Sequence, residues 1–390
     1  MGASTSYVYV DRRPVTPPLE GPINRQALGR IAKLGDLYDA TTDNFCKVSV
    51  FKQPLPPDSP AISTTNCPHT ETRFSNVSSM EEKFLELNVT GELQLSVLTG
   101  MCQPTGGYAE YLRQKKTNVF TMISTQLCHT ETVTERLEVL HEEVKNNISE
   151  KAMCYPGATH VVIEILWGAN CLITARQQRH AIEKRRRTGT GFVTSMSNIP
   201  ILGRLSVGRK RNKTEEETET SVEISGDVFP NMLPTKLGDA QKIMENIPEM
   251  IKNCNDGKGR PLTYVMIPIP RLRSFVDIRT FISVDDARTM KIVRQFDEMT
   301  DLRQKVRDQI LILSKDENRL DNYEAQAKTE LSQLLMRVRS GKEAVGCLDD
   351  FYANYFNPYH EVLMSFLRTP GVPTPSVPLH PNGINANFLV

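Results

Sequence analysis

Cysteine and histidine side chains lie next to each other at two places in this 390-residue sequence, in Cys67-Pro68-His69 and in Cys128-His129. Thiolate and imidazole groups bind zinc, but a structural zinc site takes four such ligands. Neither cluster has a second pair at ligand spacing, so we predict no metal site. The sequence also contains no phosphate-binding loop, no G-x-S-x-G and no H-E-x-x-H. We therefore expect a protein that is not an enzyme and needs no cofactor.

The stretch LELNVTGELQLSV indicates contact with lipid instead. Apolar and polar residues alternate along it, interrupted only at Gly91. A strand with one face in lipid and the other in water has this pattern, and a tilted strand crosses a bilayer in roughly 9–11 residues. The membrane-insertion candidates here are Leu85, Leu87, Val89, Leu93, Leu95 and Val97.

The same stretch also repeats every four residues. Leu85, Val89, Leu93 and Val97 would form one buried stripe on a helix. The segment is therefore compatible with a packed helix and with a transmembrane strand. A half-exposed element of an ordinary soluble protein would give the same alternation.

A second alternation, between residues 199 and 207, is interrupted by Pro200 and Arg204. Its apolar members are Ile199, Ile201, Leu205 and Val207. Basic clusters flank it and are candidates for binding anionic lipid, at about 1 kcal/mol per charge near the surface. These clusters are Arg185, Arg186 and Arg187, and Arg209, Lys210 and Arg211. Solvated charge, or a nuclear-import signal in EKRRR, would explain the same residues.

The balance of 47 basic against 46 acidic residues gives a net charge of +1, so we predict no nucleic-acid partner. The first residues lack the apolar core of a signal peptide, which predicts a cytoplasmic location with association to membranes. Gly2 and Ser6 fit a myristoylation signal, which makes Gly2 a lipidation candidate.

The most apolar stretch runs from Ala158 to Ala175 and contains Glu164 and Asn170. A transmembrane helix needs roughly 20 apolar residues, so this stretch does not qualify. Its β-branched composition predicts a long buried strand, bent or closely approached at Gly168.

The chain divides into four parts by composition and periodicity. Residues 1–26 are rich in proline and polar residues, and residues 369–390 form a proline-rich tail, so both are expected to be flexible. Strand periods prevail in residues 27–270. From about residue 283 apolar residues recur at three- and four-residue steps, which predicts an antiparallel α-helical bundle over residues 271–368.

Three motifs resemble the stonustoxin-type branch of the membrane-attack-complex/perforin and cholesterol-dependent cytolysin (MACPF/CDC) superfamily. They are ALGRIAKLGDLYDA, GATHVVIEILWGAN and IPILGRLSVGRK. The residues that carry the fold motif are Gly29, Gly35, Tyr38, Gly157, Thr159, His160 and Gly168. Two departures are an inserted Ala158 between Gly157 and Thr159, and Gly168-Ala169 in place of a glycine pair.

The resemblance implies an α+β fold with a bent, twisted four-stranded sheet, two flanking helical clusters and a following bundle similar to a focal-adhesion-targeting-like domain. The strands would lie near residues 72–79, 118–133, 158–175 and 220–229, and the clusters near 84–116 and 176–219. In pore-forming members these clusters refold into membrane hairpins.

Two functions follow as hypotheses. The first is a membrane-binding, pore-forming protein that forms homo-oligomers on a lipid membrane and inserts β-hairpins. The second is a non-lytic intracellular scaffold that keeps the fold and binds a protein partner through the helical bundle.

Overall fold

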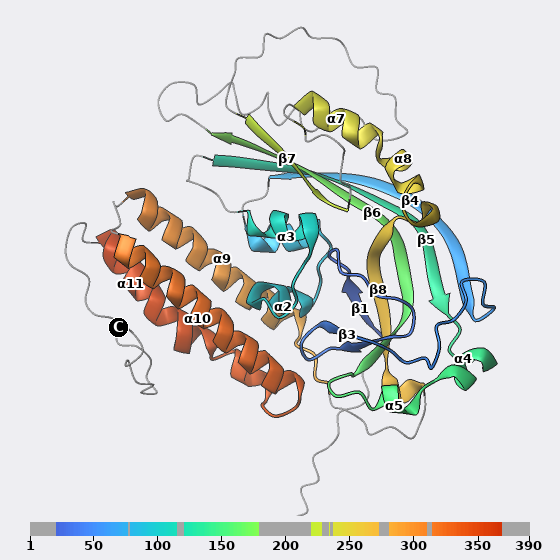
Figure 1. The fold of residues 1–390 in the computed structure, drawn as a ribbon. Coiled ribbons are helices and arrows are strands. Elements are labelled where there is room, and N and C mark those ends of the chain that lie inside the picture. The colour runs from blue at the N-terminus through green and yellow to red at the C-terminus, as the bar shows by residue number, and fades with distance from the viewer. Residues whose placement is uncertain are drawn as a thin grey trace, which may run out of the picture.

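The computed structural model describes residues 21–76, 79–114, 121–178, 220–227, 234, 237–272, 281–309 and 314–368. A long, bent antiparallel sheet forms one side of the molecule, and helices cover both of its faces (Figure 1). The fold is thus a mixture of helix and sheet, in agreement with the predicted class.

The sheet has eight strands, twice the four expected. In chain order they are β1 (Ile23–Gln26), β2 (Asp36–Asp39), β3 (Asn44–Ser49), β4 (Ile62–Asn76), β5 (Thr121–Leu137), β6 (His160–Gln178), β7 (Thr220–Gly226) and β8 (Arg260–Pro268). The expected strands correspond to β4, β5, β6 and β7, which pair in this order. The count differs because β6 is long enough to pair with β5 over Glu164–Gln178, with β7 along its second half, with β8 along its first half and with β2 at its start.

The apolar stretch that begins at Ala158 forms β6, in the centre of the sheet. A Cβ atom on Gly168 would lie 1.9 Å from the carbonyl oxygen of Thr130 on β5, so only glycine fits there. The pairing of β6 with both β5 and β8 shifts register close to this point. Gly168 therefore permits the close backbone contact next to which the register of both pairings shifts.

Residues 23–26 correct the predicted N-terminal boundary. They form β1, which pairs with Thr263–Met266 of β8, although composition placed them in the flexible segment. This pairing joins residues far apart in the sequence, so local composition does not reveal it.

Alternate side chains of the sheet contact different helices. Leu127 and Leu172 face a large apolar cluster that contains α1 (Met80–Glu86), α2 (Leu93–Thr99) and α3 (Gly106–Arg113). Cys128 and Cys171 face the opposite side, where α7 (Leu237–Glu245) and α8 (Ile247–Lys252) pack. Helices α7 and α8 are separate because Pro248, in the first turn of α8, has no backbone N–H to continue the hydrogen bonding of α7. Two short helices, α4 (Glu142–Asn147) and α5 (Glu150–Met153), lie at the far end of the sheet (Figure 1).

The C-terminal helices lie beyond α1–α3, on the side away from the sheet (Figure 1). They are α9 (Asp286–Gln309), α10 (Ser314–Arg339) and α11 (Asn357–Arg368), with a 3-10 turn at Val345–Leu348 and a π-helical turn at Tyr352–Phe356. Their apolar residues belong to the same buried cluster as those of α1–α3. The first helical cluster is therefore enclosed between the sheet and the C-terminal helices.

Candidate functional site

The insertion segment, residues 85–97, begins at the end of α1 and ends in α2. Helix α1 starts with a capping box, in which the Ser79 hydroxyl accepts from the amide of Glu82 at 3.1 Å and the Glu82 carboxylate accepts from the amide of Ser79 at 3.0 Å. Helix α2 ends at Gly100 in the left-handed conformation. Local signals thus favour two short helices, joined by residues 87–92, and the single helical stripe suggested by the four-residue repeat is not formed because Leu85 is exposed.

The apolar candidates of the segment are mostly in the core. Leu87, Val89, Leu93 and Leu95 are buried, and Val97 is partly buried against the same cluster. Leu85 is the exception, with 57% of its surface exposed. A lipid-facing role for these residues would therefore require the segment to leave its present position.

The polar residues that alternate with them are also largely buried, which sequence reasoning missed. Glu86, Glu92, Gln94 and Ser96 are all inside the protein. Each has a hydrogen bond to a neighbour: for example, the Ser75 hydroxyl donates to Glu86 at 2.8 Å, and the Gln94 side-chain amide donates to the Val89 carbonyl at 2.8 Å. The alternation therefore does not separate a buried face from a water face in this state.

One of these residues, Glu92, belongs to a buried charge cluster made of Arg25, Asp43, Glu92 and Arg339, and Ser96 forms hydrogen bonds to it. Four ion pairs connect them, Arg25–Asp43 at 2.8 Å, Arg25–Glu92 at 2.7 Å, Arg339–Asp43 at 3.2 Å and Arg339–Glu92 at 3.2 Å. Arg339 and Asp43 are completely buried and the other two nearly so. Two positive and two negative groups balance, which is the condition for burying such charges.

Hydrogen bonds complete this cluster. Tyr38 and Ser96 both donate their hydroxyls to Asp43, the former at 2.7 Å. Burial alone would raise the pKa of Asp43. The nearby guanidinium groups of Arg25 and Arg339 have the larger effect and lower the pKa of Asp43 below the usual range. Asp43 is therefore a carboxylate.

The cluster connects four distant parts of the chain. Arg25 is on β1, Asp43 is in the turn between β2 and β3, Glu92 precedes α2, and Arg339 ends α10. Neither Arg25 nor Arg339 stands out in the sequence, because nothing local distinguishes them from surface arginines. Their role becomes visible only when the chain is folded.

Most residues of the predicted fold motif lie around the pairing of β2 with β6, whereas Gly29 lies against Thr105 and Gly168 against Thr130 of β5. Tyr38 pairs with His160, and the Thr159 hydroxyl accepts from the Ala40 amide at 2.9 Å and donates to the Tyr38 carbonyl at 3.2 Å. His160 Nδ1 lies 2.8 Å from Thr159 Oγ1, and the ring packs edge-on against Phe281. Burial, with the nearby positive charge of Arg25, lowers the pKa of His160 to about 3, so it is neutral. Gly29 follows β1, Gly35 directly precedes β2, and Gly157 precedes Thr159 near Asp39.

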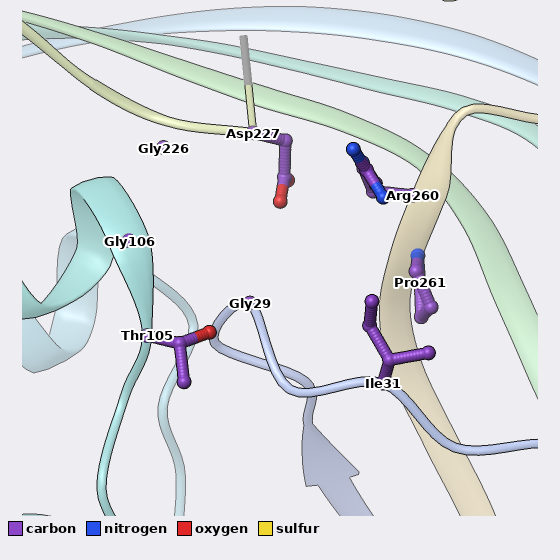
Figure 2. A pocket seen from close by; sticks show the side chains of 8 residues that line it. All are labelled: Gly29, Ile31, Thr105, Gly106, Gly226, Asp227, Arg260 and Pro261. Atoms are coloured by element: carbon purple, nitrogen blue, oxygen red, sulfur yellow. The ribbon is translucent and has the colours of Figure 1, made fainter. Parts of the chain in front are cut away.

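A pocket of about 200 Å³ lies where the sheet bends, beside the start of α3. Figure 2 shows the Asp227 carboxylate and the Arg260 side chain entering it from the end of β7 and the start of β8. The Tyr108 hydroxyl of α3 donates to the Asp227 carboxylate at 2.5 Å, and the backbone amide of Asn170 on β6 donates to the same carboxylate at 3.0 Å. Burial raises the pKa of Asp227 to about 6, despite these hydrogen bonds.

Asp227 thus connects α3 with the sheet. The contact is tight, because a Cβ atom on Gly107 of α3 would lie 2.4 Å from the Gly226 amide nitrogen. The pocket combines a carboxylate, a guanidinium and the Thr105 hydroxyl. Within the described parts of the chain, no group of three or more His, Cys, Asp or Glu side chains is placed to hold a metal ion.

The remaining candidates lie outside the described residues. They are Ile199, Ile201, Leu205, Val207, Arg185, Arg186, Arg187, Arg209, Lys210, Arg211 and Gly2. Among the helices that the structure describes, none is long and apolar enough to cross a bilayer.

Comparison with known proteins gives consistent matches. The family described as "SNTX, MACPF/CDC-like domain" matches residues 22–291. Neoverrucotoxin subunit beta from Synanceia verrucosa and stonustoxin subunit beta from Synanceia horrida are each 26% identical to the chain over 254 residues, which are 62% of this chain and 34% of each relative. The stonustoxin structure has a TM-score of 0.59 at 18% identity and covers 89% of this chain and 47% of that one. The chain spans about a third of the length of these curated relatives.

Proposed function

We propose, since the chain belongs to the stonustoxin-type MACPF/CDC-like family, that it binds membranes, oligomerises on them and inserts β-hairpins to form a pore. The relatives it matches carry the names of toxins, and one of them is called a cytolytic toxin. Membrane perforation by this chain is the function that its own geometry supports best.

One topological observation carries the proposal. Strands β4 and β5 pair up to Asn76 and Ser124, and residues 77–120 connect the two strands at that end of the sheet (the first excursion). Strands β6 and β7 pair up to Gln177 and Thr220 at the same end of the sheet, and residues 179–219 connect them in the sequence (the second excursion). Each excursion is longer than the roughly 20 residues of a two-stranded transmembrane hairpin. Extension of the existing strands would convert both into hairpins without changing the sheet.

The insertion segment lies in the first excursion. After extension, Leu85 and the other odd-numbered apolar residues would share one face of a strand, and Glu92 and Ser96 would share the other. The polar residues that are now buried in the charge cluster would then line the water side. The second excursion supplies Ile199, Ile201, Leu205 and Val207, and its basic clusters would attract anionic lipid.

We further propose a division near residue 270, with a MACPF/CDC-like domain that includes β1 in addition to residues 27–270, a helical bundle over 271–368 and a proline-rich tail over 369–390. The helical bundle is a candidate surface for a protein partner.

Two exposed positions of the segment test the proposal directly. Leu85 and Thr90 both face solvent in the folded protein but would point to opposite faces of the inserted strand. An environment-sensitive fluorophore is attached at Leu85→Cys or at Thr90→Cys, after Cys154→Ser and Cys347→Ser remove the two exposed native thiols. On vesicles we expect a lipid signal from position 85 and a water signal from position 90, together with dye release.

Electron microscopy of the same vesicles should show rings or arcs. Equal signals at the two positions, with no dye release from neutral or anionic vesicles, would reject pore formation. The scaffold hypothesis would then take its place.

A further inference from the structure

The C-terminal helices contact the insertion segment and α1 at three separate points. Asp297 of α9 accepts from the amides of Met80 and Glu81 at 2.6 and 2.9 Å, at the start of α1. Arg294 of α9 forms an ion pair with Glu81 at 2.9 Å. The third point is Glu92, at the start of α2.

Both carboxylate oxygens of Glu92 are occupied. Its Oε1 accepts from Arg25, while its Oε2 accepts from Arg339 Nε at 3.2 Å and from the Val284 amide at 3.1 Å. Arg339 also donates to the Glu92 carbonyl at 3.0 Å and to the Ser96 hydroxyl at 2.8 Å. One completely buried guanidinium thus holds both the backbone and two side chains of the segment.

These contacts are incompatible with an extended strand. The amides of Met80 and Glu81 must leave Asp297, and Glu92 must leave Arg339, before residues 80–97 can pair as a continuation of β4. Buried ion pairs are little screened by salt, and separating one inside the protein leaves an uncompensated charge. The apolar residues of the segment are covered by α9 and α10 in the same cluster.

We propose that the C-terminal helices form an inhibitory clamp on the insertion segment, closed by Arg339 and Asp297, and that opening of this clamp precedes insertion. The clamp rests on the proposed pore function and adds its regulation. Contact with a membrane or with a neighbouring copy of the chain must supply the force that separates the helices from the segment.

The clamp can be tested by linking α1 to α9 with a cleavable bridge. Glu81 and Arg294 form an ion pair at the protein surface, so Glu81→Cys and Arg294→Cys place two thiols where a reducible bis-maleimide can join them. The variants are made with Cys154→Ser and Cys347→Ser. We expect the linked protein to bind vesicles as the unlinked one does but to release dye at least tenfold more slowly. Reductant should restore the rate.

A matched control uses a pair within the C-terminal helices. Arg288 and Asp349 form a surface ion pair at 3.0 Å, so Arg288→Cys and Asp349→Cys allow the same linker without touching α1. This linked control should release dye at the unlinked rate.

The outcomes separate the two proposals. If the α1–α9 link leaves dye release as fast as after reduction, the clamp is wrong and the pore function stands. If the protein releases no dye even after reduction, the pore function is wrong and the clamp falls with it. Slow release with the link and fast release without it supports both.

Discussion

The Arg339 guanidinium at the end of α10 donates to the Glu92 carboxylate at the start of α2, although 247 positions separate them in the sequence. The bond lies inside the protein, with Arg339 completely buried. It places a charged residue of the C-terminal helices against the segment whose alternating sequence suits a membrane strand. In the folded state, protein groups therefore bond to the same polar residues that would face water in a pore.

Removal of Arg339 should destabilise the protein strongly. Arg339→Met leaves Asp43 and Glu92 with one guanidinium between them, and breaking a buried ion pair from one side costs about 3–5 kcal/mol. Chemical unfolding should show this loss, whereas Arg294→Met at the surface pair with Glu81 should have a far smaller effect.

A paired substitution provides the control. Arg339→Met together with Glu92→Gln leaves Arg25 and Asp43 balanced, so the double variant should lose less stability than the sum of the two single variants. Additive losses would mean that the pair does not interact in the folded protein.

The strands were the part of the fold that the sequence could predict. Residues 158–175 show a β-branched apolar run around one glycine, and β6 forms there because such a run suits a strand buried on both faces. The short strands β1, β2 and β3 complete the sheet through long-range pairing, for which four to six residues give little local signal.

The charge cluster could not be predicted for a different reason. Glu92 and Ser96 alternate with leucines, and alternation normally means that the polar residues face water. Here both sides of the segment are enclosed, one by the sheet and the other by the C-terminal helices, so its polar residues needed buried partners. The identity of those partners depends on contacts between distant segments.

The backbone contact at Gly168 should not tolerate a side chain. In Gly168→Ala the new Cβ atom would lie 1.9 Å from the Thr130 carbonyl oxygen, so β5 and β6 must separate locally, at a cost of about 3 kcal/mol. Thermal unfolding should register this loss. Gly346→Ala is the control, because a Cβ atom there meets nothing within 4 Å. Equal melting temperatures for the two variants would contradict the close contact.

A charge at Leu85 should block insertion without disturbing the folded protein. Leu85 is 57% exposed, so Leu85→Asp should melt like the parent protein. In a hairpin the new carboxylate would face lipid, where Arg or Lys costs roughly 2–4 kcal/mol at the midplane and a carboxylate costs less. We expect dye release to slow several-fold. Thr90→Asp, which is exposed in the folded protein and would face water in the hairpin, should release dye at the parent rate.

Asp227 should make the protein less stable as the pH rises. Its folded pKa of about 6 lies above the ordinary value of 3.8, so the folded state binds a proton more tightly than the unfolded chain does between these values. The free energy of unfolding should therefore fall as the pH rises from about 4 to 6 and stay lower above it. Since one pKa unit corresponds to about 1.4 kcal/mol, the penalty from this residue is up to about 3 kcal/mol.

The variant Asp227→Asn tests this sign. Its side-chain oxygen can still accept from Tyr108 and from the Asn170 amide, while the charge beside Arg260 and His129 is gone. Chemical unfolding at a series of pH values should show the variant to be more stable than the parent at pH 8, with the difference shrinking towards pH 4. Asp256→Asn, at an exposed position, should leave the pH profile of the parent unchanged. A difference between Asp227→Asn and the parent that grows on acidification would show that the buried carboxylate stabilises the contact between α3 and the sheet, contrary to the raised pKa.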